Sequence, residues 1–194
     1  MAADLSTATD RRRRSHPVRW AVVGVSVLVL LPLVLVLGSR LGDDPTLGQR
    51  SAVIDKPVPE FSLPNIDGGT LSSKDLVGRP YLVNFWASWC APCRQEHEKL
   101  EALYARYRPQ GMELLGVLWN DTPDGARSYR RDLGGDWPIL RDPNEKLAVD
   151  FGVTGPPETF LVDDTSIIRY KVRGAVTAAH VAKIQQALSQ LGLG

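Results

Sequence analysis

The chain contains 194 residues, of which 43% are hydrophobic and 23% charged, a composition typical of a globular protein rather than a disordered or fibrous one. Its 23 Lys and Arg residues nearly balance 22 Asp and Glu residues. The sequence therefore lacks the basic surplus of a nucleic-acid-binding protein, and we expect no nucleic-acid partner. Two cysteines are too few for a multi-disulfide framework or a four-thiolate metal centre, so we expect one globular domain without a metal site.

The N-terminal region combines a basic segment with an apolar one. Residues 1–19 contain five arginines and two aspartates, and residues 20–38 form a run of 19 residues without a charge. A helix of that length reaches about 28 Å, close to the ~30 Å hydrocarbon core of a bilayer. We predict a basic cytoplasmic tail at 1–19 and a transmembrane anchor at 20–38, with the remainder outside the cytoplasm by the positive-inside rule. A cleaved secretory signal is the alternative, and it would export the same domain.

Residues 39–58 lack periodicity and are predicted to form a linker, whereas residues 59–194 are predicted to form the folded domain. The domain opens with a short hairpin, in which 61–63 and 70–72 flank Asp67-Gly68-Gly69. The β-branched and aromatic run 81–86 predicts a buried strand. Apolar residues spaced i, i+3, i+4 and i+7 then predict a helix over 93–107.

The second half of the domain continues the alternation of strands and helices. A second apolar strand is predicted at 112–119, followed by a polar helix at 123–133 that opens with Thr122-Pro123. A short helix is expected at 144–151, paired strands at 159–163 and 167–172, and a last helix after Thr177. Such an order is typical of an α/β fold with a mixed central sheet flanked by helices.

Both cysteines lie in Cys90-Ala91-Pro92-Cys93, between the predicted strand 81–86 and the following helix. Two intervening residues in a first helical turn bring the sulfurs within bonding distance. The partial positive charge of a helix N-terminus favours a thiolate at Cys90, which we expect to be exposed, whereas Cys93 points inward. Thiol–disulfide exchange requires such a pair. A static structural disulfide, or a zinc site that uses Cys90, Cys93 and His97, is the alternative.

The run Val83-Asn84-Phe85-Trp86-Ala87-Ser88-Trp89-Cys90-Ala91-Pro92-Cys93 resembles the active-site stretch of the thioredoxin superfamily. With Cys93-Arg94-Gln95-Glu96-His97 and the later Gly152-Val153-Thr154-Gly155-Pro156-Pro157-Glu158-Thr159-Phe160-Leu161-Val162-Asp163, the chain is similar to the membrane-anchored reductases of cytochrome c biogenesis. These are the CcmG/DsbE type, related to ResA and TlpA. The resemblance covers roughly residues 56–194 and is consistent with the anchor. It implies a thioredoxin fold, to which the hairpin and the transmembrane helix are N-terminal additions.

The resemblance also implies roles for individual residues. Cys90 aligns with the attacking thiolate and Cys93 with the buried resolving thiol. Thioredoxins carry a buried Asp where this chain has Asn84, and in the resembling type acidic residues that match Glu96 and Glu158 take its place. We therefore predict that Glu96, assisted by Glu158, tunes the thiol pKa values and shuttles the proton of Cys93.

Substrate contacts are expected from Trp89, Pro156 and Pro157. Pro157 falls where the relatives have a cis-proline that faces the disulfide. The residue before it usually offers its N–H and C=O to an extended substrate, but Pro156 has no N–H, so only the carbonyl remains. The implied partners are apocytochrome c, its chaperone or another exported thiol protein as substrate, and a membrane thiol reductant of the CcdA or DsbD kind. No cofactor is expected beyond the Cys90–Cys93 disulfide itself.

The predicted function is therefore disulfide reduction on the periplasmic, extracytoplasmic side of the cell membrane. A disulfide-forming oxidase for exported proteins is one alternative, because sequence alone leaves the direction of electron flow open. A tethered binding module with a static disulfide is the non-enzymatic alternative. A peroxidase is disfavoured, because that chemistry needs a hydroxyl three residues before the nucleophile and Ala87 occupies the position.

Overall fold

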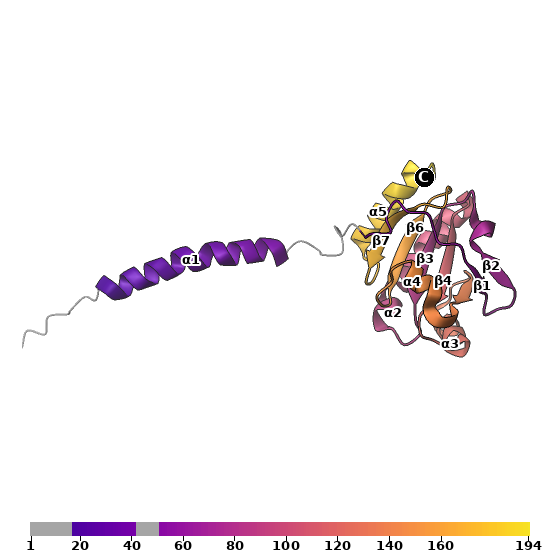
Figure 1. Cartoon of the computed structure of the whole chain (residues 1–194), viewed down its shortest axis with the longest axis horizontal. Helices are drawn as coiled ribbons and strands as arrows, with labels where there is room; N and C mark the ends of the chain where they lie inside the picture. The colour runs from indigo at the N-terminus through magenta and orange to yellow at the C-terminus, as the bar shows by residue number, and fades with distance from the viewer. Residues whose placement is uncertain (1–16, 42–50) are drawn as a thin grey trace, which may run out of the picture. The chain divides into compact units, whose positions relative to one another are not determined.

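The computed structural model describes residues 17–41 and 51–194 (Figure 1). The predicted tail residues 1–16 and linker residues 42–50 lie outside the described residues. The chain divides into two units, the first ending at Asp44 and the second beginning at Pro45.

The first unit contains one helix, α1, which spans Pro17–Leu41. Its described side chains, at residues 20–32 and 34, are exposed. Counting only residues that the structure describes, no helix combines the length and the apolar character needed to cross a bilayer.

The second unit is built on a five-stranded sheet with the order β5-β4-β3-β6-β7 (Figure 1). The strands are β3 (Tyr81–Trp86), β4 (Glu113–Leu118), β5 (Ile139–Arg141), β6 (Glu158–Val162) and β7 (Ile168–Arg173). Strands β3, β4 and β5 run parallel, whereas β6 and β7 are antiparallel to their neighbours. The mixed sheet predicted from the sequence is confirmed. Strand β5 was not predicted, because a three-residue strand is too short to show a hydrophobic period.

The helices and the hairpin also agree with the sequence patterns. The helices are α2 (Ala91–Tyr107), α3 (Pro123–Leu133), α4 (Lys146–Asp150) and α5 (Ala178–Gln190), with short 3-10 turns at Ser73–Leu76, Arg108–Gln110 and Pro143–Glu145. Strands β1 (Ser62–Pro64) and β2 (Thr70–Ser72) form the predicted antiparallel hairpin. Helix α3 begins as expected at Thr122, whose hydroxyl accepts a hydrogen bond of 3.1 Å from the N–H of Gly125.

The sheet separates two sets of buried side chains, because successive residues of a strand point to opposite faces. On one face Tyr81, Val83 and Phe85 of β3 pack with residues of α4 and β1. On the other face Leu82 packs with residues of α2 and α5, and Trp86 packs with both cysteines and with α3. We call these the α4 face and the α2 face.

The segment of the chain that precedes β2 contacts both edges of the sheet. At the β7 edge, the N–H of Asp55 donates to the carbonyl of Ile168 (2.8 Å) and the N–H of Ile168 donates to the carbonyl of Lys56 (2.9 Å). At the β5 edge, the N–H of Ile66 donates to the carbonyl of Ile139 (2.9 Å). Val53, Ile54 and Val58 also pack on the α4-face core. Residues 51–58, which the sequence pattern places in the linker, therefore contact the domain.

Candidate active site

The two cysteines form a disulfide at the start of α2, with their Cα atoms 5.3 Å apart. Cys90 is the residue that caps the helix, and its Sγ accepts a hydrogen bond of 3.1 Å from the N–H of Cys93. The helix therefore directs an N–H donor and the positive end of its dipole at the Cys90 sulfur, which stabilises a thiolate there. This geometry is the one expected from the sequence.

The expected exposure of Cys90 is wrong for the disulfide form. Cys90 is 4% exposed and Cys93 is 2% exposed. In this form the Cys90 side chain is bonded to Cys93 and packs in one cluster with Trp86 and Ala87. The predicted contrast between an exposed and a sheltered sulfur is thus small in this redox state.

The loop that carries Cys90 is held by the segment that follows β4. The N–H of Ser88 donates to Oδ2 of Asp121 (2.5 Å), and Nε1 of Trp89 donates to the carbonyl of Asn120 (3.1 Å). Trp89 is nevertheless 60% exposed, so its indole forms an oriented apolar surface next to Cys90. Its position is compatible with the substrate contact predicted for it.

Glu96 is the buried carboxyl group nearest in sequence to the disulfide. It lies one turn after Cys93 on α2 and is 1% exposed. Its Oε1 accepts from Nδ2 of Asn84 (2.8 Å) and its Oε2 accepts from the N–H of Val176 (2.7 Å). Burial raises the pKa of Glu96 from 4.5 to about 7, against the opposing effects of these two hydrogen bonds and of Lys99. The group can therefore change protonation near neutral pH.

Glu158 is fully buried but has different partners. Its Oε2 lies 2.6 Å from Nζ of Lys171, and its Oε1 lies 3.7 Å from Nε of Arg173. Oε1 also accepts from the N–H (3.0 Å) and the hydroxyl (2.8 Å) of Thr154. Lys171 in turn donates to the carbonyl of Gly152 (3.0 Å). Glu158 is thus a charge-compensated group that ties β6 and β7 to the segment 152–154.

The two glutamates lie on opposite faces of the sheet. Asn84 donates to both Glu96 and the hydroxyl of Thr159 (2.9 Å), which places all three on the α2 face. Glu158 precedes Thr159 in β6 and pairs with Phe85, so its side chain points to the α4 face. The structure therefore brings Glu96 to the side of the sheet that carries the cysteines and places Glu158 on the other.

The peptide bond between Pro156 and Pro157 is cis, as the resemblance implies. Pro157 is buried, directly before β6, and its carbonyl accepts a hydrogen bond of 2.9 Å from the N–H of Gly174. Pro156 is half-buried. Because β6 pairs with β3 in antiparallel fashion, the two prolines directly before β6 and the segment after β3 that leads to Cys90 lie at the same end of adjacent strands.

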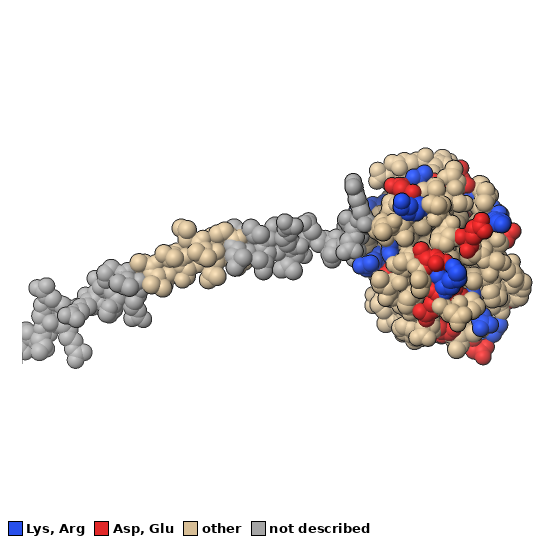
Figure 2. Space-filling view, viewed as in Figure 1, with Lys and Arg blue, Asp and Glu red and all other residues tan. Residues whose placement is uncertain are grey.

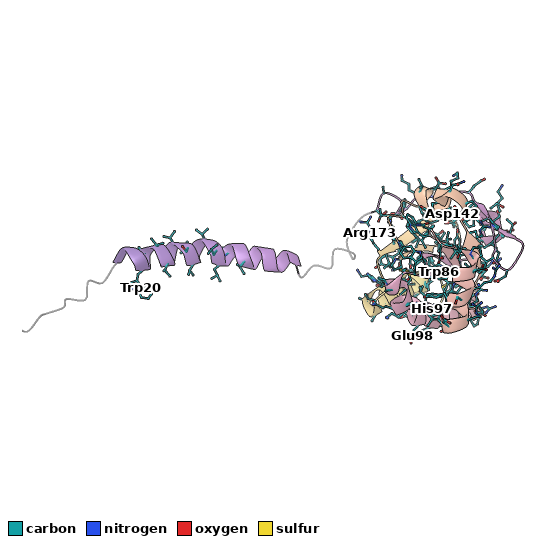
Figure 3. The ribbon with its side chains drawn as sticks, turned by 90° about the horizontal axis from the view of Figure 1, so that it is seen from below. Trp20, Trp86, His97, Glu98, Asp142 and Arg173 are labelled. Atoms are coloured by element: carbon teal, nitrogen blue, oxygen red, sulfur yellow. A yellow bond between two sulfur atoms is a disulfide. The ribbon has the colours of Figure 1, made fainter. Side chains whose placement is uncertain are left out.

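Two further residues connect α2 with α3: Tyr129, which the sequence pattern did not single out, and His97, which it named as a candidate zinc ligand. The hydroxyl of Tyr129 on α3 donates to the carbonyl of Cys93 (3.0 Å) and so attaches α3 to the first turn of α2. His97 is buried, and its Nε2 lies 3.1 Å from the carbonyl of Leu133. In Figure 3 the labelled residues Trp86 and His97 lie within the second unit, whereas Glu98 lies at its edge. Tyr129 is the single aromatic residue in the polar helix 123–133, and this is the sequence signal that it packs against another element.

The visible face of the second unit carries no patch of a single charge. Figure 2 shows acidic and basic side chains interspersed over the visible face of the second unit. Over residues 17–41 and 51–194, no group of three or more His, Cys, Asp or Glu side chains is arranged to hold a metal ion. The chemistry that the described residues support is therefore centred on the disulfide.

Comparison with known proteins relates this site to a family. Residues 54–171 match the AhpC/TSA family. The thiol:disulfide interchange protein DsbE of Allochromatium vinosum is 39% identical over 161 residues, which cover 81% of this chain and 86% of that protein. DsbE of Escherichia coli K12 is 38% identical over 76% of this chain and 85% of its own length. The thiol:disulfide interchange protein HelX of Rhodobacter capsulatus is 36% identical over 80% and 92%.

The solved structures agree with these relatives. A thiol:disulfide interchange protein of the thioredoxin family from Chlorobium tepidum superposes with a TM-score of 0.61 and 26% identity, over 72% of this chain and 98% of that one. The architecture is therefore a thioredoxin-like α/β fold with an added N-terminal hairpin. Because relatives that are 38–39% identical to it in alignments that cover most of their own length are thiol:disulfide interchange proteins, this chain belongs to the AhpC/TSA family and, within it, to the DsbE-type thiol:disulfide oxidoreductases.

Proposed function

We propose that this protein is an exported, membrane-tethered reductant that opens disulfides in apocytochrome c, so that haem can be attached. The observation that carries the proposal is the arrangement on the α2 face, where a Cys90–Cys93 disulfide at a helix N-terminus lies one helical turn from a buried carboxyl group of raised pKa. The family membership supports disulfide interchange. Apocytochrome c as substrate, or its chaperone, rests on the resemblance of the two sequence motifs.

The reaction proceeds through a mixed disulfide. In the reduced protein the Cys90 thiolate, stabilised by the start of α2, attacks a substrate disulfide and displaces one substrate thiolate. Cys93 then loses its proton and attacks Cys90. The bond between Cys90 and the substrate breaks, the second substrate thiolate leaves, and the Cys90–Cys93 disulfide forms. A membrane thiol reductant of the CcdA or DsbD kind returns two electrons to this disulfide.

Glu96 is the group that we assign to the proton of Cys93. A general base works best when its pKa lies near the working pH, and that of Glu96 is raised to about 7. Its two hydrogen bonds, from Asn84 and Val176, keep the carboxylate in one orientation. No ion pair from the described residues compensates its charge, so protonation is the route by which it becomes neutral.

Glu158 has a positioning role in this proposal. Its contacts with Lys171 and Thr154 fix the segment that leads to Pro156 and Pro157. An extended substrate segment would bind there through the carbonyl of Pro156, with Trp89 as an apolar surface beside the reacting sulfur. The assistance to Glu96 that the sequence predicts would therefore act through substrate placement, from the opposite face of the sheet.

The membrane anchor is part of the same proposal. Helix α1 includes all of the uncharged run 20–38, and the arginines of residues 11–14 and 19 precede or begin it. This polarity favours a cytoplasmic N-terminus and a periplasmic second unit. Protease added to intact spheroplasts should then remove the second unit, whereas protection from the protease would contradict the proposed location.

The decisive experiment traps the partner in cells. In the full-length Cys93→Ser variant, Cys90 can attack a substrate but the mixed disulfide is not resolved, so a covalent complex that dithiothreitol releases should accumulate. Mass spectrometry should identify apocytochrome c or its chaperone in it. The Cys90→Ser/Cys93→Ser double variant is the matched control and should trap nothing.

The alternatives predict other results. An oxidase would trap many exported proteins without haem motifs, and its disulfide would have a midpoint potential well above about −200 mV. A binding module with a static disulfide would trap nothing, and its Cys93→Ser variant would keep full activity in cells. Either result would overturn the reductase proposal.

A further inference from the structure

A small cavity lies behind Cys93, on the α2 face. The space in it that is open to a water-sized sphere is about 10 Å³, at the lower limit for holding one water molecule. Besides Cys93, its lining includes the polar side chains of Trp86, His97 and Arg130, and Glu96 is not among the lining residues. The cavity therefore adjoins the resolving sulfur without including the carboxyl group assigned to it.

Two of the residues that line this cavity each carry a buried N–H donor without an acceptor among the described residues. Nε1 of Trp86 and Nε of Arg130 are buried, and within the part of the chain that the structure describes neither has a hydrogen-bond partner. The Arg130 guanidinium is fixed, because Nη1 contacts Asp67 (2.5 Å) and Nη2 donates to the carbonyl of Trp137 (3.0 Å). Buried N–H groups are nearly always paired with protein or with an ordered water, so these two donors point to a bound acceptor.

His97 offers the complementary acceptor. A carbonyl oxygen can only accept, so the 3.1 Å contact with Leu133 requires that Nε2 carries the hydrogen, and the neutral ring then has its lone pair on Nδ1. The rings of Tyr129 and Trp137 lie 5.3 Å and 5.2 Å from the imidazole and hold its orientation. A water that accepts from two N–H groups can donate to this nitrogen.

The charged surroundings of His97 are mixed. Burial lowers the pKa of His97, whereas the hydrogen bond to Leu133 and the charges of Glu101 and Glu98 act in the opposite direction. The titratable or charged groups that face it from packed elements are Cys93 on the same helix and Tyr129 and Arg130 on α3. The neutral ring is thus the resting form, and it is the form that can take up a proton.

We propose that this cavity binds one water molecule, held by Trp86 and Arg130, that passes the proton of Cys93 to Nδ1 of His97. The proposal rests on the function proposed above and gives Cys93 a second proton route beside Glu96. In the resolving step the thiol proton moves through the water to His97, which becomes an imidazolium. The electron pair left on Cys93 attacks Cys90, the bond from Cys90 to the substrate sulfur breaks, and the substrate leaves as a thiolate that takes a proton from solvent. The imidazolium returns its proton to solvent.

The test separates the two chemical steps in the full-length protein. Attack by Cys90 is measured as its alkylation rate in a Cys93→Ala background, and resolution as the rate at which Cys93 releases glutathione from a mixed disulfide on Cys90. All rates are compared in a Glu96→Gln background, which closes the parallel route through Glu96. There we expect His97→Gln to slow resolution about 10-fold or more while attack is unchanged. The matched control His180→Gln removes a buried imidazole on α5 and should leave both rates unchanged. Equal resolution rates with and without His97→Gln in this background would overturn the proposal, whereas loss of attack by wild-type Cys90 on every disulfide would overturn the proposed function instead.

A second variant tests the water rather than the histidine. Trp86→Phe keeps an aromatic ring at this position but removes the indole N–H. It should slow resolution by about the same factor as His97→Gln. The double variant with His97→Gln should be no slower than either single variant, because both remove the same relay. If the double variant instead slowed resolution by the product of the two single-variant factors, the proposal would be overturned. A crystal structure should show a water within hydrogen-bond distance of Nε1 of Trp86 and Nδ1 of His97, and ¹⁵N NMR should find the hydrogen of His97 on Nε2. A dry cavity, or the other tautomer, would contradict it.

Discussion

The two faces of the sheet treat a buried glutamate in opposite ways. On the α4 face Glu158 contacts Lys171 at 2.6 Å and Arg173 at 3.7 Å, so its negative charge is compensated. On the α2 face Glu96 accepts two hydrogen bonds but has no cationic partner among the described residues, and burial raises its pKa to about 7. Equal burial thus accompanies an ion pair on one face and a carboxyl group of raised pKa on the other.

The difference shows that burial alone does not identify a functional carboxyl group. A buried charge with an ion-pair partner is compensated, and removal of that partner affects structure. An uncompensated carboxyl group responds to pH, and its neighbourhood is where proton transfer can occur. The face that carries the disulfide is the face with the uncompensated group, which is why we assign proton transfer to Glu96 and positioning to Glu158.

The largest expected effect comes from breaking the ion pair on the α4 face. Lys171→Met leaves Glu158 buried without its nearest cation, and should lower the free energy of unfolding by about 3–5 kcal/mol, toward the lower end because Arg173 remains. Urea denaturation measures the change. Adding Glu158→Gln should recover most of it, and the exposed control Lys183→Met should stay within about 0.5 kcal/mol. A Lys171→Met variant as stable as wild type would show that the pair is not structural.

Glu96 should give a smaller effect that depends on pH. The folded carboxyl group binds its proton up to about pH 7, whereas the unfolded one releases it near 4.5, so stability is full below about 4.5 and falls as the pH rises through 7. The loss amounts to about 3 kcal/mol across this window. Glu96→Gln should remove that slope relative to wild type, measured by denaturation at a series of pH values. Parallel curves for the two proteins would refute the raised pKa.

Asn84 sharpens the comparison on the α2 face. Its amide donates to Glu96 and so favours the ionised form. Asn84→Ala should therefore raise the pKa of Glu96 above about 7, and should cost about 1–3 kcal/mol of stability. A ¹³C NMR titration of the glutamate carboxyl carbons measures the pKa directly. A lower pKa in the variant would mean that Asn84 does not control the group.

The smallest effect on stability is expected at Trp89. Because its indole is 60% exposed, Trp89→Ala should change the free energy of unfolding by less than about 0.5 kcal/mol. If the indole contacts an extended substrate, reduction of a peptide disulfide should become about 10-fold less efficient, as for loss of one aromatic contact. Reduction of glutathione disulfide should be unaffected. Equal losses on both substrates would indicate a change at the sulfurs instead.

Much of the fold followed from local sequence patterns. Strands β3 and β4 and helices α2, α3 and α5 have clear periods or caps, and the cysteine motif sits at a strand–helix junction that the pattern already predicts. The assignment of Glu96 and Glu158 to different faces could not follow in the same way. It depends on the pairing of Phe85 with Glu158 and on contacts between residues far apart in the chain, such as Val176 with Glu96.

The burial of Cys90 could not be predicted for a related reason. The position of its sulfur depends on the redox state and on packing against Trp86, and neither is encoded by the spacing of the motif. The relation of His97 to Leu133 likewise joins residues from two helices. Sequence spacing identified the reacting atoms, whereas the groups that surround them required the tertiary structure.

The partly covered edges of the sheet have a consequence for a thiol:disulfide oxidoreductase. An open outer strand presents unpaired N–H and C=O groups and invites other polypeptides to add as a further strand. Here residues 55–57 occupy part of the β7 border and residues 65–66 occupy part of the β5 border. Self-association by strand addition is thereby discouraged, and a client polypeptide is left to engage the protein at its sulfur chemistry rather than along its flanks.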